Sequence, residues 1–486
     1  MEKLYFGFSR RDITPVTDKM ISLAGQYYAR HTREIHSRLE FNCVAISKGS
    51  EQLIMGTLDG GGMQEPVHEK IREEVAKREP AIRKESIFIN AIHTHNAPSM
   101  KVQISKDAIG PAMQEDEEVY SAKEYTPFVI PLISETIVEA WRKREEGGIM
   151  RAFGNARIGH CRRAVYSDGT AEMYGDTTRR DFVGLEAGED TGVDILYFCD
   201  KTGRKKGMFL NVACPSQVME ATYKVSSDFA GRARELLKEE YGEDFHTLYQ
   251  ISPAGCQSPR DLVRHYTVEP DFWHEDGVEE HAKRLLHAVR TAQEYPIDYS
   301  PIFKQTTLRV GLPRRRASYM DYINAQKEVA RLTAILPEKE AFAEFCKETF
   351  ANEKLDGPGP YDSKLHHFVK IKNANAVINR YQDQDAKPSI HFDMNVARIG
   401  DIAIATNPFE LYLYFGQIIK ARSKAVQTFL VQLSAGADLP GGYLPSPDAE
   451  KFGGYGGLII NGQVGSDGGY KLVDTTVEAI NQLFEE

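Results

Sequence analysis

Three short polar segments carry the residue types that hydrolytic and metal-dependent enzymes use. His93-Thr94-His95, Cys214 and Glu410 each follow a mainly apolar stretch of the chain. Imidazole, thiolate and carboxylate groups bind zinc, and imidazole also transfers protons near neutral pH. Taken alone, the histidines are more often a polar strand end than a site, and the cysteine is more often a buried apolar thiol than a nucleophile. Glu410 suits an acidic helix start and a ligand about equally. Only the combination of the three points to a site.

The stretches before these segments predict the elements that position them. A hairpin is expected from strands 41–46 and 52–58, followed by a helix over 66–77. The strand 86–92 then delivers the histidines at its carboxyl end, which is where α/β sheets present their sites. A second hairpin, 193–199 with 207–213, leads into Cys214. Strands return at 389–394 and 396–405 before Glu410.

Composition narrows the class of protein. The chain has 486 residues, 41% hydrophobic and 27% charged, as in ordinary globular proteins. The net charge of −10 makes a general nucleic-acid surface unexpected. Its six cysteines include no CxxC pair, which indicates free thiols. The N-terminus shows no secretory signal, and the apolar segment 127–141 is too short and too polar to span a bilayer. We therefore expect a cytoplasmic protein with no membrane partner.

Short motifs spread over the whole chain add a resemblance to these patterns. DITP and TLD occur first, then HTH followed by two residues and proline, GHCRR and SSDFAG, and finally AGCQSP, NPFEL, GGYLPSP and GGYGG. In type and order they resemble the neutral ceramidase family. The resemblance implies an α/β fold with β-sheets flanked by helices. It also implies hydrolysis of the amide bond of an N-acyl substrate with one zinc ion.

The resemblance assigns roles to particular residues. It implies that His93, Glu410 and Tyr443 are zinc ligands. The catalytic residues that it implies are His95 for proton transfer, Arg162 and Tyr455 for the oxyanion, and Ser258 in the amide pocket. Where the family has a second zinc histidine this chain has Cys214, so the expected metal set is His93, Cys214, Glu410 and Tyr443.

Cysteine at this position leaves alternatives open. Cys214 can bind zinc as a thiolate, so that metal-bound hydroxide remains the nucleophile. Alternatively the metal is lost, and Cys214 with His95 forms a thiol–imidazole pair; a two-thiol mechanism with Cys256 is a further variant. A non-catalytic relic that only binds ligands is the alternative from a different class.

The domain organisation and the substrate class are predicted from the same resemblance. Residues 1–486 are predicted to form a single catalytic domain, with a charged helical insertion over 313–385 and without the family's C-terminal immunoglobulin-like domain. Without a secretion signal or that domain, a small or polar amide, or an ester, is a better expected substrate than membrane ceramide. The sequence does not indicate an oligomeric state.

Overall fold

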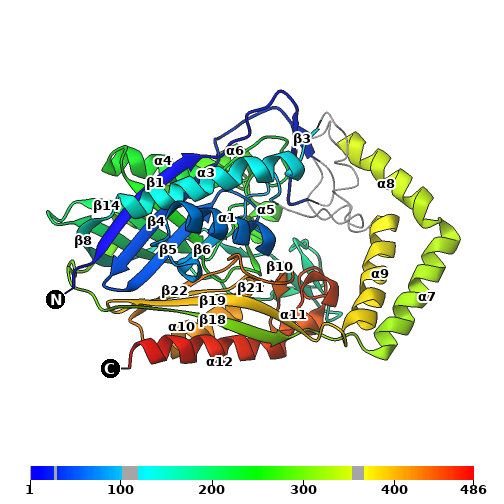
Figure 1. Ribbon diagram of the computed structural model, residues 1–486. Coiled ribbons are helices and arrows are strands. Elements are labelled where there is room, and N and C mark those ends of the chain that lie inside the picture. The colour runs from blue at the N-terminus through cyan, green and yellow to red at the C-terminus, as the bar shows by residue number, and fades with distance from the viewer. Residues whose placement is uncertain (1, 27–29, 101–118, 353–365, 486) are drawn as a thin grey trace.

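Two β-sheets pack face to face, and helices cover both outer faces (Figure 1). The computed structural model describes residues 2–26, 30–100, 119–352 and 366–485. The four-layer arrangement confirms the predicted α/β class with sheets flanked by helices.

The larger sheet has the strand order β15-β14-β13-β8-β1-β4-β5-β6, with β17 also pairing with β8. Its strands are β1 (Tyr5–Asp12), β4 (Glu40–Lys48), β5 (Glu51–Leu58), β6 (Ile87–Ala91), β8 (Glu145–Asn155), β13 (Gly192–Asp200), β14 (Lys205–Val212), β15 (His246–Ile251) and β17 (Gln293–Glu294). Its covering helices are α1 (Glu65–Arg78), α3 (Ala122–Arg142), α4 (Asp228–Tyr241) and α6 (His274–Arg290). Both predicted hairpins are present, as β4–β5 and β13–β14.

The smaller sheet has the order β18-β19-β20-β22. Its elements are β18 (Phe303–Pro313), β19 (Ser389–Ile399), β20 (Ile402–Thr406), β22 (Gln427–Val431) and the outer helices α10 (Leu413–Arg422) and α12 (Ser466–Leu483). The predicted division between strands 389–394 and 396–405 is wrong. The chain instead turns at Gly400, whose φ of 66° suits glycine, so β19 is continuous to Ile399.

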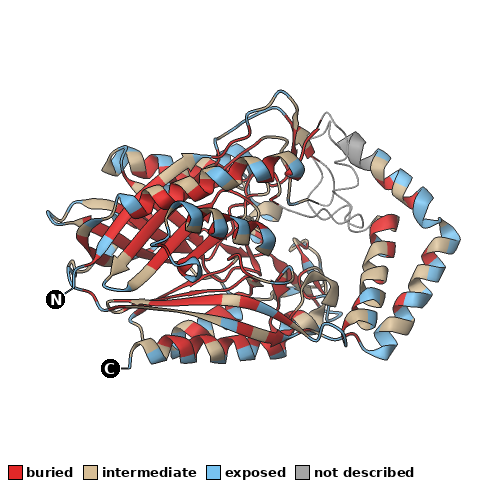
Figure 2. Ribbon diagram, in the orientation of Figure 1, coloured by how far each residue is buried: buried red, intermediate tan, exposed pale blue. Residues whose placement is uncertain are grey.

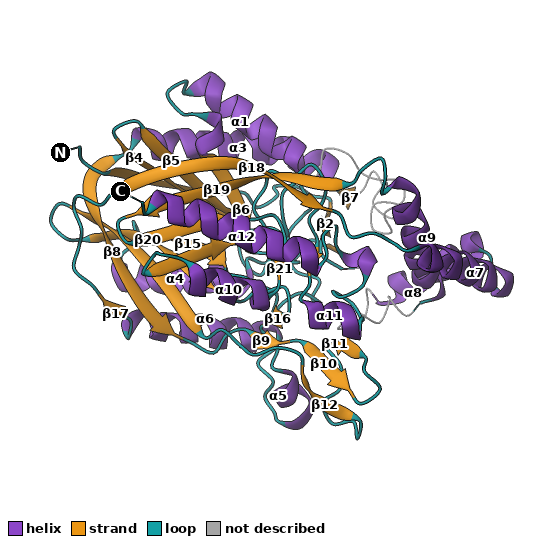
Figure 3. Ribbon diagram, turned by 90° about the horizontal axis from the view of Figure 1, so that it is seen from below, coloured by secondary structure: helices purple, strands orange, loops and turns teal. Residues whose placement is uncertain are grey.

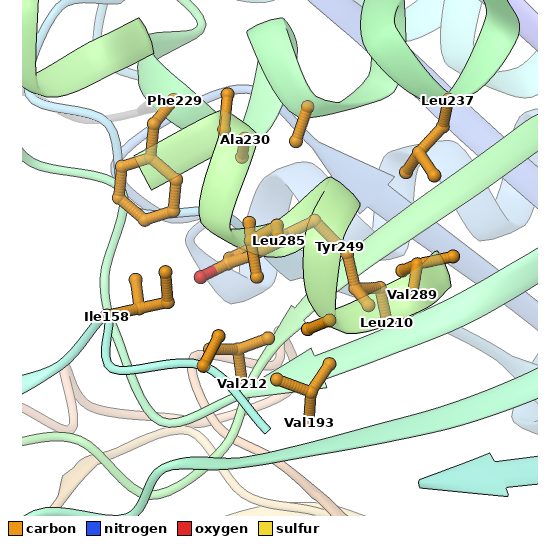
Figure 4. Packing of buried hydrophobic residues seen from close by; sticks show 14 of the residues in the cluster. Ile158, Val193, Leu210, Val212, Phe229, Ala230, Leu237, Tyr249, Leu285 and Val289 are labelled. Carbon is orange, nitrogen blue, oxygen red and sulfur yellow. The ribbon is translucent and has the colours of Figure 1, made fainter. Parts of the chain in front are cut away.

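Separate layers of apolar side chains hold the sheets and helices together. Between the sheets, Phe198 packs against Phe6 and Phe209 with ring centroids 5.4 and 5.2 Å apart. On the outer face of the larger sheet, Val193, Leu210 and Val212 meet Phe229 and Leu285 of the covering helices (Figure 4). Most strands of both sheets are therefore largely buried, whereas the edge strand β18 is mostly of intermediate exposure (Figure 2). Such cores fix the strand ends rigidly, which a precise site requires.

The insertion forms an arm that extends from the body (Figures 1 and 3). It contains α7 (Tyr319–Ile335), α8 (Glu338–Asn352) and α9 (His367–Asp383), in agreement with the predicted helical character. The arm has a small core of its own, formed by Leu332, Phe345 and Phe368 among others. At its base, Arg380 of α9 donates to the backbone oxygens of Arg315 and Gly462, both at 3.0 Å.

Short elements complete the fold around the strand ends. They are β2 (Met20–Leu23), β3 (Arg30–Thr32), β7 (Val119–Tyr120), β9 (His160–Cys161), β10 (Arg163–Tyr166), β11 (Ala171–Met173), β12 (Phe182–Leu185), β16 (Gln257–Ser258), β21 (Glu410–Leu411), β23 (Tyr443–Leu444), α5 (Leu262–Thr267) and α11 (Pro447–Phe452). Within the described ranges, the helices include none long and apolar enough to cross a membrane.

Candidate functional site

The carboxyl ends of strands from both sheets converge on one region. Strands β5 and β6 run parallel, as do β14 with β15 and β20 with β22. Backbone hydrogen bonds join the segments that follow β22 and β15 to neighbouring strands: Ala435 donates to Ile89, Gln432 to Ile251, and Ser252 to Val212. Polar side chains that follow distant strands are therefore brought together, as the sequence predicted for His93 and Glu410.

A cavity of about 700 Å³ opens at this convergence, and both His93 and His95 line it. Its size is within the usual range for small-molecule sites. The lining combines apolar residues such as Met63 and Leu439 with polar ones such as Gln64 and Ser434. The cavity can therefore accommodate a small ligand with both polar and apolar parts.

His93 lies two residues after β6 and points toward Glu410. Its φ of 64° breaks the extended backbone directly after β6. The Nδ1 atom lies 2.6 Å from the Gly61 carbonyl oxygen, and Nε2 lies 3.6 Å from Oε2 of Glu410. A carbonyl only accepts, so Nδ1 carries a hydrogen. Burial lowers the pKa of His93, but the Glu410 carboxylate and the Gly61 carbonyl outweigh it and the net pKa is raised.

Glu410 and Tyr443 lie opposite each other in a short parallel ladder formed by β21 and β23. Burial raises the pKa of Glu410, but His93 and Arg162 favour the carboxylate more strongly and the net pKa is lowered. Burial raises the pKa of Tyr443 well above its usual value, which keeps the phenol protonated. Tyr455 packs edge-on against Tyr443, with ring centroids 5.6 Å apart.

Arg162 joins these residues into one cluster. It is almost completely buried, and its Nη2 atom lies 3.2 Å from the Tyr443 hydroxyl and 3.5 Å from Oε2 of Glu410. The same atom donates to the Gly255 carbonyl at 3.0 Å. A guanidinium fixed by several acceptors is a preorganised donor for an oxyanion.

Ser258 lies behind this cluster, in β16, which pairs with β9 immediately before Arg162. It is fully buried, and its hydroxyl oxygen lies 2.9 Å from the Tyr174 hydroxyl oxygen. Ser258 is not among the residues that line the 700 Å³ cavity. Its link to the site runs through Tyr174.

Cys214 is placed differently from the other predicted ligands. Its thiol is fully buried in the core against α4 and α6, with the backbone oxygens of Pro215 and Ile158 at 3.4 and 3.6 Å from Sγ. Burial, together with the nearby Asp228 carboxylate, raises the pKa of Cys214 well above that of a free thiol. Among the residues that the structure describes, no three or more His, Cys, Asp or Glu side chains form a group that could hold a metal ion. His93, Cys214 and Glu410 therefore do not come together as such a set.

Sequence reasoning missed three residues that contact the site. Gln217 and Glu220 are buried in the turn after Cys214, and both approach His95; Tyr174 contacts Glu220. The signal was a pair of polar residues three positions apart, just beyond Cys214, in a segment considered only for its thiol.

Comparison with known proteins supports the fold. No protein-family model matches the sequence, and no curated protein matches it. Among solved structures, a ceramidase complexed with C2 matches with a TM-score of 0.66 and 15% identity, over 99% of this chain and 76% of that chain. Neutral ceramidase from Pseudomonas aeruginosa matches with a TM-score of 0.64 and 16% identity, over 99% and 75%. Such low identity establishes architecture and leaves activity to be argued from the site. The chain has the fold of the neutral ceramidases, as its motifs predicted.

Proposed function

We propose that the protein is a zinc-dependent hydrolase that cleaves the C–N amide bond of a small or polar N-acyl substrate. The observation that carries the proposal is the buried cluster of His93, Glu410, Tyr443 and Arg162 beside the cavity that His93 and His95 line. An imidazole, a carboxylate, a phenol and a guanidinium there come from four separate parts of the chain. The solved neutral ceramidases of the same fold support amide chemistry.

The geometry around His93 is compatible with a zinc ion. Ligand bonds of about 2.0–2.2 Å at a tetrahedral angle keep two ligand atoms roughly 3.4 Å apart, and His93 Nε2 lies 3.6 Å from Glu410 Oε2. Metal-binding histidines usually donate their other ring N–H to a carbonyl or carboxylate, as Nδ1 of His93 does to the Gly61 carbonyl. We propose His93, Glu410 and Tyr443 as ligands. Cys214 could join them only if its thiol left the Ile158 and Pro215 carbonyls and lost its proton.

The other side chains would act on the substrate as follows. When bound, zinc would acidify a water molecule and polarise the acyl carbonyl. Arg162 would donate to the developing oxyanion together with Tyr455, because both are fixed donors beside Tyr443. His95 would take up the proton of the attacking water and return it to the departing amine. Ser258 would act through Tyr174, which it contacts.

The thiol mechanism finds less support. The Cys214 thiol bonds backbone carbonyls, and its raised pKa opposes thiolate formation. The ring nitrogens of His95 are instead near Glu220 and Gln217. A pair able to activate the thiol requires a hydrogen bond between the two.

Elemental analysis of the purified protein and a library of N-acyl amides and esters test the proposal together. We expect about one zinc ion per chain and turnover of polar amides that chelation abolishes and added zinc restores. Turnover that survives chelation but stops on alkylation of Cys214 would favour the thiol enzyme. Ligand-induced stabilisation without turnover of any library member would favour the binding relic.

A further inference from the structure

The turn that follows Cys214 presents two buried polar side chains to His95. Ser216 donates its backbone N–H to the Ile92 carbonyl at 3.0 Å, which ties this turn to the residue before His93. From it, Gln217 and Glu220 extend to opposite nitrogens of the His95 ring. They have 1% and 0% of their surface exposed. Burying a carboxylate and an amide beside an imidazole is costly unless they are paired with it.

Donor and acceptor chemistry fixes the direction of these contacts. Gln217 Oε1 lies 3.5 Å from an N–H of Arg162, and a guanidinium only donates, so the amide oxygen faces Arg162. The amide nitrogen of Gln217 then faces Nε2 of His95 at 2.8 Å. Because an amide nitrogen only donates, Nε2 of His95 must accept. The hydrogen of a neutral His95 ring is therefore on Nδ1.

Glu220 is placed to receive that hydrogen. Its Oε2 atom lies 3.2 Å from Nδ1 of His95, within ion-pair distance. Neither of these two buried atoms has a hydrogen-bond partner among the described residues, so each is available to the other. The other oxygen, Oε1, accepts from the Tyr174 hydroxyl at 3.3 Å. The hydrogens thus all point one way: Arg162 donates to Gln217, Gln217 donates to His95, and the hydrogen on Nδ1 of His95 faces Glu220.

We propose that Glu220 is a positioning residue that holds His95 in the tautomer with its hydrogen on Nδ1 and its lone pair on Nε2. The role of His95 in proton transfer rests on the proposed function; the tautomer does not. In this form His95 enters the reaction as a base. The hydrogen bond from Gln217 must first release Nε2. Nε2 then takes a proton from the attacking water as its oxygen bonds the acyl carbon. It returns that proton to the amine nitrogen when the C–N bond breaks.

Nitrogen-15 NMR of protein labelled at histidine tests the tautomer without any substrate. The His95 signals are assigned by their absence in His95→Asn. In the wild-type protein we expect a hydrogen on Nδ1 and none on Nε2. A ring that carries its hydrogen on Nε2, or on both nitrogens, would overturn the proposal even if the enzyme hydrolyses amides.

Glu220→Gln tests the cause of the tautomer. We expect the preference for Nδ1–H to be lost and, with a substrate in hand, kcat to fall by about 10²–10⁴-fold with KM little changed. Glu40→Gln is the control, since it removes a carboxylate that pairs with Arg234 and does not contact His95. An unchanged tautomer in Glu220→Gln would contradict the role of Glu220. If Glu220→Gln does not fold, Tyr174→Phe is measured beside the wild type. This variant removes the other donor to Glu220, and the tautomer of His95 should be kept if the proposal holds.

Discussion

Glu410 and Tyr443 are register partners in a two-residue parallel ladder, although they are 33 positions apart in the sequence. The segment that follows β20 thus pairs directly with the segment that contains the GGYLPSP motif. Gly442, with φ of 64°, lets the chain enter this ladder. The Gly462 peptide lies so close to Tyr443 that a side chain there would collide with its carbonyl. The carboxylate and phenol are therefore fixed by backbone pairing before any ligand arrives.

Glu410→Gln is expected to lower zinc content and abolish activity. The amide keeps the size of the carboxylate but removes the negative charge that pairs with His93 and Arg162. Elemental analysis and hydrolysis assays check this. Glu478→Gln, at an exposed position of α12, is the control and should behave as wild type. Full zinc occupancy and full activity in Glu410→Gln would contradict the metal proposal.

Arg162→Lys should reduce kcat by about 10²–10³-fold, the usual cost of losing an oxyanion donor. A lysine ammonium cannot reproduce the planar contacts to Gly255 and Tyr443. Steady-state kinetics with the best library substrate measure the loss. Arg157→Lys, at a half-exposed surface ion pair, should leave kcat unchanged. Equal kcat values for Arg162→Lys and Arg157→Lys would show that Arg162 takes no part in the mechanism.

Cys214→Ala should keep both zinc and activity while lowering stability by roughly 1–2 kcal/mol, as expected for loss of a buried apolar group. Denaturant unfolding and metal analysis measure the two effects. Loss of zinc from Cys214→Ala would show that the Cys214 thiol binds the metal in the wild-type protein. Loss of activity with zinc retained would instead favour a chemical role for the thiol.

Gly25→Ala should impair the site through His95 alone. Gly25 has φ of 97°, and an added Cβ would lie 2.2 Å from Cγ of His95. The ring would have to move away from Glu220 and Gln217. We expect activity to fall while zinc content stays constant, as measured on the same preparation. Gly169→Ala, which has a similar φ of 82° but open space around the Cβ, separates the clash from backbone strain.

Stability should fall in acid partly because of His246. Burial lowers the pKa of His246 from 6.5 to about 3, and its ring stacks on Phe8. Below pH 6.5, His246 of the unfolded chain binds a proton that it does not bind in the folded protein until about pH 3. Protonation therefore stabilises the unfolded state relative to the folded state. The cost is roughly 1.4 kcal/mol for each pH unit in that window.

His246→Phe should reduce this acid sensitivity, because the phenyl ring can stack in the same place and Nδ1 of His246 has no hydrogen-bond partner among the described residues. Urea unfolding between pH 4 and pH 7 measures the slope. His287→Gln, at an exposed position of α6, is the control. A slope for His246→Phe equal to that of wild type would contradict this account.

Local sequence patterns predicted much of the fold because alternating apolar residues and turn residues reflect interactions between neighbours in the chain. The alternating apolar residues and polar turns predicted the hairpins β4–β5 and β13–β14. Where β19 ends depended on a glycine turn inside one long apolar run, so alternation could not locate it. The two-sheet packing depends on contacts between distant strands, which no local pattern contains.

The candidate site was predictable only where motifs mark it. His93, Glu410 and Tyr443 were named from motifs, and the structure places them around Arg162. Gln217 and Glu220 were not named, because their importance comes from facing His95 across the fold. The direction of the Cys214 side chain is likewise set by packing against α4 and α6, which spacing along the chain does not reveal.

The arm leaves and re-enters the body at a single point. Strands β18 and β19 pair along their full length, and their last pair joins Pro313 to Ser389. In topological terms the whole arm is thus the loop of one β-hairpin. A short turn can close the same ladder, and loop-closure entropy changes only slowly with loop length. A chain in which residues 314–388 are replaced by such a turn keeps every pair of β18 with β19, and it loses the bonds that Arg314, Arg315 and Arg380 make to Gln463, Gly457 and Gly462 at the base.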